Sequence, residues 1–434
     1  MTILIAPRVV PAQLPAAGHK QWKGLEFIYW RCWWNQAWIV QEISLARKAV
    51  FMCGETNLDA HDLFAAASFL HEHKLTNATM IDLTSAINLA EVRQACLENR
   101  KLDLFTLLIS TRMYRASDKR DRIYSLLGLC TDEDASTIIP DYAMSAAEVY
   151  TNFARRLLNR GTLDVLTAVG DFRRRCIPDL PSWVPDWSIS SRTQEFLLPG
   201  KEISAAASKD SEAKLNFSGN LILHAAGLVF DTVVDTGLPF VFPYIDMQVA
   251  YIFSPMETMN RAPFQHAILN WFVSYWTAIR LDEWKGFLSR LKTFGYPTGE
   301  EASHIYLRTI TADSYPVADL ESAYSAYCKT NMLSKPDREV KVEEIQESAT
   351  FRTHLDRACH GRRMFLTSRG YLGLGPLMTE RGAKVVLLTG GKTPYILRKE
   401  KSGEYTSRGE CYVHGIMRGE AWDESIANEE FRII

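Results

Sequence analysis

RRMFLTSRGYLGLGPLMTERGAKVVLLTGGKTPYILRKE, residues 362–400, is the stretch that decides the fold. It contains short apolar runs rich in β-branched residues, such as KVVLL, of the length typical of strands, roughly four to eight residues. Glycines separate these runs, and glycine suits the tight turns that join antiparallel strands. The segment ECYVHGIM, residues 410–417, continues the pattern. The C-terminal end is therefore predicted to form a small antiparallel sheet or partly open barrel.

Upstream of this stretch the chain is mainly helical. In SAAEVYTNFARRLLNRG, residues 145–161, Ser145 and Glu148 match a capping box, apolar residues recur on one face, and Gly161 supplies the stop. Residues 61–75 and 91–112 also have helical spacing. The predicted fold class is α+β, with a mainly helical N-terminal half and a small antiparallel β-rich C-terminal unit.

The length of 434 residues exceeds the roughly 250–300 residues at which one core stops growing. We expect three regions: a helical region over 1–190, a variable α+β middle over 191–350, and a β-rich region over 351–434 that packs on the first. In the middle, NLILHAAGLVFDTVVDTG (220–237) is typical of strands. Residues 262–279 are uncharged, but their aromatic residues recur at helical spacing among polar ones, which favours a packed helix over a membrane span.

Composition restricts the partners. The net charge is −2, from 49 basic and 51 acidic residues, and no long run of one sign occurs, so nucleic-acid binding is not expected. The eight cysteines are scattered, which is typical of reduced thiols in a cytoplasmic protein. The cluster His354, Cys359 and His360 matches no zinc spacing, so we expect no metal. Neither TGGKTP nor GYLGLGP fits a phosphate-binding loop, so we expect no cofactor. The sequence predicts no oligomeric state.

The sequence contains two sets of candidate catalytic residues, and each set also has a structural interpretation. Tyr412 and His414 alternate along one predicted strand, so both side chains can point into a pocket mouth as an acid/base pair. The alternative is a structural histidine whose hydrogen bonds are satisfied. Glu42 is a candidate acid, or it anchors a helix end.

The candidate ligand-binding residues are mostly aromatic. Tyr244, Tyr251 and Trp271 lie in an aromatic middle stretch that either lines a cavity or fills a core. LPSWVPDWS, residues 180–188, is expected to be a stiff extended seam between the helical and β-rich parts, in which Trp183 or Asp186 also borders a ligand site.

Several segments, taken in order, resemble the fungal heterokaryon incompatibility proteins, the HET domain family. They are WWNQAWIVQEISLARKAVFMCGE (33–55), SDKRDRIYSLLGL (117–129), PDYAMSAAEVY (140–150), LPSWVPDWS (180–188), RRMFLTSRGYLGLGP (362–376) and GECYVHGIMRGEA (409–421). The resemblance implies a fungal, intracellular protein of a family that recognises non-self after cell fusion and triggers cell death. It also implies an N-terminal module distantly similar to the TIR domain.

The chain departs from the family pattern near its start. The strand-rich region and the motif close to L-W-I-D-A-x-C-I-N-Q that usually precede the W-x-x-Q-E segment are not found, and Gln36 stands where the family usually has arginine. Residues 1–190 are therefore expected to be a truncated HET-like region. An open sheet without its first strands does not form the usual ligand crevice, so we expect no NAD-cleaving activity.

Two classes of function follow. The first is an interaction or signalling protein of the heterokaryon incompatibility type, which binds a protein partner. The alternative is a repurposed, cofactor-independent enzyme of secondary metabolism, a cyclase or isomerase, that acts on an apolar small molecule. The sequence leaves open whether the protein is an enzyme.

Overall fold

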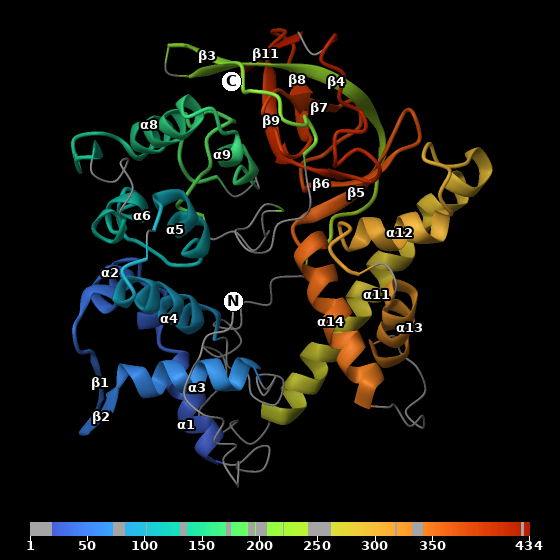
Figure 1. The fold of residues 1–434 in the computed structure, drawn as a ribbon. Helices are drawn as coiled ribbons and strands as arrows, with labels where there is room; N and C mark the ends of the chain where they lie inside the picture. The colour runs from blue at the N-terminus through green and yellow to red at the C-terminus, as the bar shows by residue number, and fades with distance from the viewer. Residues whose placement is uncertain are drawn as a thin grey trace. The chain divides into compact units, whose positions relative to one another are not determined.

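The computed structural model describes residues 20–72, 83–100, 102–130, 137–170, 175–189, 196, 206–219, 221–241, 262–316, 319–331, 342–426 and 429–434. The chain divides into two compact units, Met1–Lys101 and Leu102–Ile434. The three regions expected from the sequence stay a prediction. The α+β fold class is confirmed, since helices dominate the first half and most strands lie near the C-terminus (Figure 1).

The first unit consists of short helices and one hairpin. Its elements are α1 (Lys20–Tyr29), η1 (Cys32–Asn35), α2 (Trp38–Leu45), β1 (Val50–Cys53), β2 (Thr56–Asp59), α3 (Ala60–Glu72) and α4 (Thr84–Leu97). Trp34 is buried and stacks on Phe51, with ring centroids 5.2 Å apart. Arg93 of α4 donates hydrogen bonds to the carbonyls of Ile43 and Ala46, which satisfies the end of α2.

The second unit begins with helices that largely follow the sequence prediction. They are α5 (Leu104–Ser110), α6 (Asp121–Tyr124), η3 (Leu127–Leu129), α8 (Ala146–Asn159) and α9 (Asp164–Thr167). The capping box of α8 is confirmed: the side chain of Ser145 accepts from the backbone of Glu148, and Glu148 accepts from the backbone of Ser145. Residues 91–112, predicted as one helix, contain the end of α4 and all of α5, because Asp103 caps a new helix start by accepting from Thr106.

A closed ring of strands forms the centre of the second unit (Figure 1). The strands are β3 (Leu215–Ser218), β4 (Ile222–Thr236), β5 (Arg362–Thr367), β6 (Leu372–Pro376), β7 (Lys384–Leu388), β8 (Tyr395–Lys399), β9 (Tyr405–Glu410), β10 (Tyr412–Val413) and β11 (Glu429–Ile433). Strand β4 pairs with β7, and the order β7, β8, β9, β11 returns to β4. The C-terminal strands thus form a barrel as predicted, but the ring is closed rather than partly open, because β4 from the middle of the sequence completes it, and β11 pairs with β9 in parallel.

The long strand β4 makes this closure possible. It pairs with β11 and β3 near its start, with β7 along its middle and with β5 near its end. Register shifts at Val229–Asp231 and Val233–Asp235 mark bulges, which bend a strand. From β5 the sheet continues through β6 to β10. One strand from the middle of the sequence therefore joins the ring to the remaining strands of the sheet.

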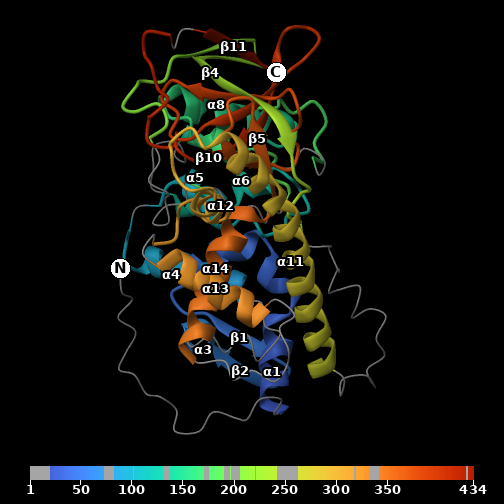
Figure 2. The same ribbon diagram turned by 90° about the vertical axis from the view of Figure 1, so that its right-hand side faces the viewer.

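A helical layer lies beneath β5 and β6 (Figure 2). It comprises α11 (Ala262–Phe294), α12 (Ala302–Ile310), α13 (Leu320–Asn331) and α14 (Val342–Cys359). Trp284 and Phe351 are fully buried there, in one cluster with Tyr412 and Leu374 of the sheet. The helix predicted over 262–279 is the first part of α11, and none of the helices in the described residues is both long and apolar enough for a membrane span.

The segment LPSWVPDWS joins the helices to the barrel. Trp183 donates from Nε1 to the carbonyl of Leu221 in the β3–β4 hairpin, at 3.0 Å, whereas Trp187 packs against Phe105 and Phe153 of the helices α5 and α8. Both indoles are fully buried. These contacts fit a seam between the helical and β-rich parts. The expected extended conformation is wrong, because the segment folds into turns and the Val184 N–H donates to the carbonyl of Pro181 at 3.0 Å.

Candidate functional site

Tyr412 and His414 lie side by side at the end of the sheet. The Tyr412 hydroxyl is 2.9 Å from Nδ1 of His414, and their exposed fractions are 1% and 3%. The carbonyl of His414 accepts from Tyr296, whose hydroxyl in turn accepts from the backbone of Leu372. The expected contact between the tyrosine and the histidine is confirmed, while their catalytic role stays a prediction.

Glu300 completes a hydrogen-bonded chain with these two residues. It lies in the loop before α12, and its Oε2 is 2.9 Å from Nε2 of His414. The same oxygen accepts from Thr298 at 2.7 Å, and Oε1 accepts from Arg308 at 3.2 Å. Because an ionised carboxylate only accepts, Nε2 carries the proton, Nδ1 accepts, and the hydroxyl of Tyr412 donates.

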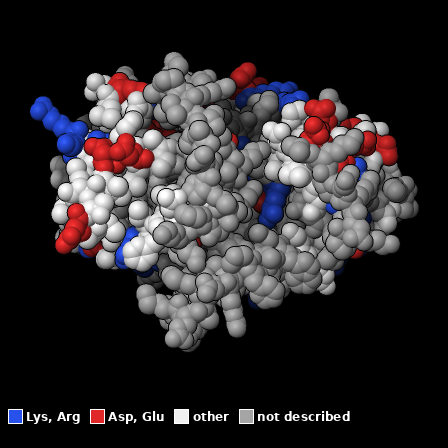
Figure 3. Space-filling view, turned by 90° about the horizontal axis from the view of Figure 1, so that it is seen from below, with Lys and Arg blue, Asp and Glu red and all other residues white. Residues whose placement is uncertain are grey.

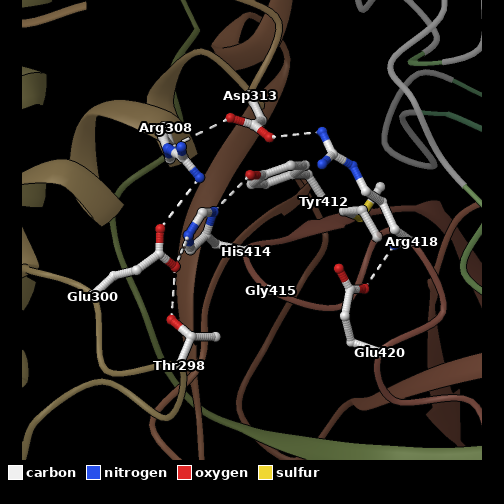
Figure 4. Close-up of a pocket in the computed structure, with 10 residues that line it drawn as sticks. Thr298, Glu300, Arg308, Asp313, Tyr412, His414, Gly415, Arg418 and Glu420 are labelled. Atoms are coloured by element: carbon white, nitrogen blue, oxygen red, sulfur yellow. Dashed lines mark hydrogen bonds and ion pairs between the residues drawn. The ribbon is translucent and has the colours of Figure 1, made fainter. Parts of the chain in front are cut away.

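The charged side chains around the hydrogen-bonded residues Tyr412, His414 and Glu300 neutralise one another (Figure 4). Asp313 lies between two guanidinium groups, 3.7 Å from Arg308 and 3.6 Å from Arg418. Burial alone would raise the pKa of Glu300, but the hydrogen bonds from Thr298 and His414, with the charge of Arg308, lower it. Burial raises the pKa of Tyr412 well above its usual value. The site therefore holds an ionised glutamate and a neutral tyrosine.

A small cavity opens beside this network (Figure 4). Its volume is about 180 Å³, and its wall includes Tyr412, His414 and the loop that follows them. Gly415 has a φ of +89°, and a Cβ there would lie 2.7 Å from Cγ2 of Thr298, so only glycine fits this turn. Ligand pockets usually measure roughly 300–1,000 Å³, so this cavity suits a side chain or a very small molecule.

These hydrogen bonds connect the phenol of Tyr412 to the carboxylate of Glu300 through the imidazole of His414, as in acid/base relays. The phenol is a weak acid in this environment, because its tyrosinate form would be buried. The geometry therefore favours a structural role over proton transfer. The hydrogen bonds hold the loop after His414 against the start of α12.

The remaining predicted residues do not join this network. Glu42 is exposed on α2 of the first unit. Trp183 and Asp186 are buried, and Asp186 accepts from the backbone of Cys176 and Ser188 at 2.9 and 3.0 Å. They do not line the cavity beside His414. Their ligand-binding role stays a prediction.

Three other predicted ligand-binding residues fall outside what the structure describes. Tyr244 and Tyr251 lie outside the described residues, and the side chain of Trp271 in α11 does too. In the described part of that stretch, Phe240 packs against Trp276 and Trp284, with ring centroids 6.0 and 5.6 Å apart. Phe240 and Trp284 belong to the buried core between the helical layer and the sheet.

Sequence reasoning missed the partners of His414. Glu300 is 114 positions away from it, and Thr298, Arg308 and Asp313 lie in the same distant segment. The residues around Glu300 contain no local signal for a contact with His414. Among the described residues, no group of three or more histidine, cysteine, aspartate or glutamate side chains is placed to hold a metal ion.

Comparison with protein-family models matches the part of the chain that contains this network. The model of the Het-6 beta-barrel domain matches residues 300–434, which contain the network except for Tyr296 and Thr298. Heterokaryon incompatibility protein 6, OR allele, of Neurospora crassa is 24% identical over 471 aligned residues, covering 93% of this chain. The chain is therefore similar to fungal heterokaryon incompatibility proteins, over residues 300–434 to the barrel domain and over most of its length to the Neurospora protein.

The match is uneven in two respects. The chain spans 66% of the length of the Neurospora heterokaryon incompatibility protein. The matched barrel range begins after β4, although β4 pairs with β5, β7 and β11. No solved structure matches the chain.

Proposed function

We propose that this protein is an interaction and signalling protein of the heterokaryon incompatibility type that binds a protein partner. The observation that carries the proposal is the network around His414, in which each side chain is engaged by another part of the protein. Such a network rigidifies a surface loop, residues 415–420, rather than leaving a reactive group ready. A rigid loop loses little entropy when a partner binds.

The surface supports a partner other than nucleic acid. On the face in Figure 3, basic and acidic side chains of the described residues occur in small, mixed groups. The net charge of −2 adds no long-range attraction for a polyanion. A protein partner that contacts a limited, mixed surface fits this distribution.

We propose that the protein acts in the cytoplasm. All eight cysteines are free, two of them fully buried and three exposed. Burial raises the pKa of the Cys359 and Cys411 thiols well above the usual value, which keeps them protonated and unreactive. Free exposed thiols suit a reducing compartment.

We also propose that the chain does not cleave NAD. In the described part of the first unit, β1 and β2 form an antiparallel hairpin, and a ligand crevice of the usual kind needs the carboxyl ends of parallel strands. Glu42 lies exposed on a short helix there. The purified chain should release no nicotinamide from NAD in a mass-spectrometric assay, and release that is lost in Glu42→Gln would refute this part of the proposal.

The interaction proposal is tested by inducible expression in a fungal host. Affinity capture of the wild-type chain should recover a protein partner in near-equal amount, and induction should slow growth. Glu300→Gln, which disturbs the loop, should reduce both effects, while Glu301→Gln, an exposed neighbour, should keep them. Neither a partner nor a growth effect from the wild-type chain would refute the proposal.

A cofactor-independent enzyme of secondary metabolism remains a second candidate. Its support is the 2.9 Å contact between Tyr412 and His414 beside a cavity, the arrangement of an acid/base pair. It ranks second because the cavity is small and the phenol is held in its neutral form. Fungal extracts incubated with the protein should then lose a metabolite, and His414→Asn should abolish that loss.

A further inference from the structure

A second cavity lies next to the network and has different chemistry. Its volume is about 280 Å³, near the lower limit of roughly 300 Å³ for small-molecule pockets. Ile426, which is 64% exposed, supplies apolar surface at its wall, and the buried side chains of Leu228, Phe230 and Ile416 also line it. It shares Gly415 and Glu420 with the cavity beside His414. We call this space, lined by β4 residues and the loops around Arg369 and Ile416, the Arg369 groove.

Arg369 is the cation of this groove. Its guanidinium lies 4.9 Å from the ring centroid of Phe230 and 5.8 Å from that of Tyr371. These aromatic faces orient the planar group, as in other cation–π pairs. Within the described part of the chain, no carboxylate lies within 4.0 Å of this guanidinium, and its one hydrogen bond, to the carbonyl of Phe230, is long at 3.4 Å.

The carboxylate of Asp231 is occupied by other donors. Its Oδ2 accepts from the backbone N–H of Arg369 at 2.9 Å, and its Oδ1 accepts from the backbone of Thr232 at 2.7 Å and from the hydroxyl of Ser368. Asp231 thus fixes the backbone of Arg369 without pairing with its side chain. An arginine held beside two aromatic rings with its charge unpaired is a ready anion site.

We propose that the Arg369 groove binds a small carboxylic acid with a short apolar tail. The carboxylate pairs with the forked guanidinium, and the short tail lies against the exposed side chain of Ile426. Glu420, held by the backbone N–H of Arg418 at 2.8 Å, repels an anion at the wall shared with the other cavity. The ligand carboxylate therefore lies at the Arg369 end. This proposal does not depend on the proposed function, so an experiment that refutes one does not refute the other.

Calorimetric titration of the full chain with 3-phenylpropanoate tests the proposal, with the neutral 3-phenylpropan-1-ol as the matched probe. Saturable binding of the acid is expected, with the alcohol at least about tenfold weaker, because a charge-assisted pair is lost. Arg369→Gln should weaken the acid by at least about tenfold, while Arg381→Gln, at an exposed arginine in the turn before β7, should not change it.

A second pair of variants guards against misfolding. Ile426→Glu adds a negative charge at an exposed wall residue and should abolish binding, whereas Ile139→Glu, at a residue 82% exposed, should leave it intact. Circular dichroism should show the same fold for all variants. The proposal is overturned if the acid does not saturate at millimolar concentration, if the alcohol binds equally well, or if Arg369→Gln binds like the wild type. A peptide ending in an apolar residue that binds more tightly than the acid would overturn the choice of a small molecule.

Discussion

Nε2 of His414 lies 2.9 Å from Oε2 of Glu300, although 114 positions separate the two residues. The contact joins the end of β10 to the loop before α12, and the histidine is 4% exposed while the glutamate is 34% exposed. It is therefore a partly buried link, and its energetic contribution is smaller than that of a fully buried pair.

This link predicts a pH-dependent stability. The folded state lowers the pKa of Glu300 below its usual 4.5, so the ionised form stabilises the protein above that pH. The contribution is lost as the pH falls through the folded-state pKa. Urea unfolding should show that Glu300→Gln costs about 1 kcal/mol at pH 7 and that the difference shrinks below about pH 4. A difference that stays constant from pH 7 to pH 3 would contradict this.

The indole of Trp183 should be a major stabilising element. It is fully buried, contacts Phe217 at 5.6 Å between ring centroids, and donates to the carbonyl of Leu221. Trp183→Ala should lower the free energy of unfolding of the second unit by about 3–5 kcal/mol in chemical denaturation. Trp183→Phe keeps most of the ring volume and should cost less. Equal losses from both variants would show that the hydrogen bond, not the volume, carries the effect.

Arg362 and Glu410 form a buried pair beneath Phe196. The side chains are 2% and 3% exposed, the closest N–O distance is 3.3 Å, and the guanidinium lies 3.7 Å from the Phe196 ring centroid. Arg362→Met leaves a buried carboxylate without its cation and should cost about 3–5 kcal/mol. The double variant with Glu410→Leu should recover part of that loss in thermal unfolding. If the double variant were less stable than both single variants, the pair would not be coupled in this way.

Gly227 should be indispensable for closing the barrel. A Cβ at this position would lie 2.3 Å from the carbonyl oxygen of Leu387 in β7, so Gly227→Ala must displace a backbone on either side. At Gly286 in α11 a Cβ would meet nothing within 4 Å, so Gly286→Ala should raise stability by about 0.5–1 kcal/mol. Thermal unfolding should move in opposite directions for the two alanine variants, and a neutral Gly227→Ala would refute the close approach.

Local patterns were sufficient for much of the secondary structure. The capping residues of α8 and the glycine-separated strands from β5 to β8 follow from interactions within a few residues of each other. The contact between Tyr412 and His414 was also predicted, from the rule that residues two apart on a strand share a face, although β10 ends at Val413 and His414 lies in the turn after it. The family was recognisable because its motifs recur in a fixed order.

Tertiary structure alone decided how the barrel closes and what completes the site. Neither the pairing of β4 with β5, β7 and β11 nor the approach of Glu300 to His414 has a local signal, because both join segments more than a hundred residues apart. The sequence by itself determined the capped helix α8, the strands from β5 to β8 and the proximity of Tyr412 to His414. Packing determined that the histidine is held between a tyrosine and a glutamate, and that Arg369 keeps its charge exposed over two aromatic rings. Such contacts form only when folding brings distant segments together, so the spacing of residues along the chain does not predict them.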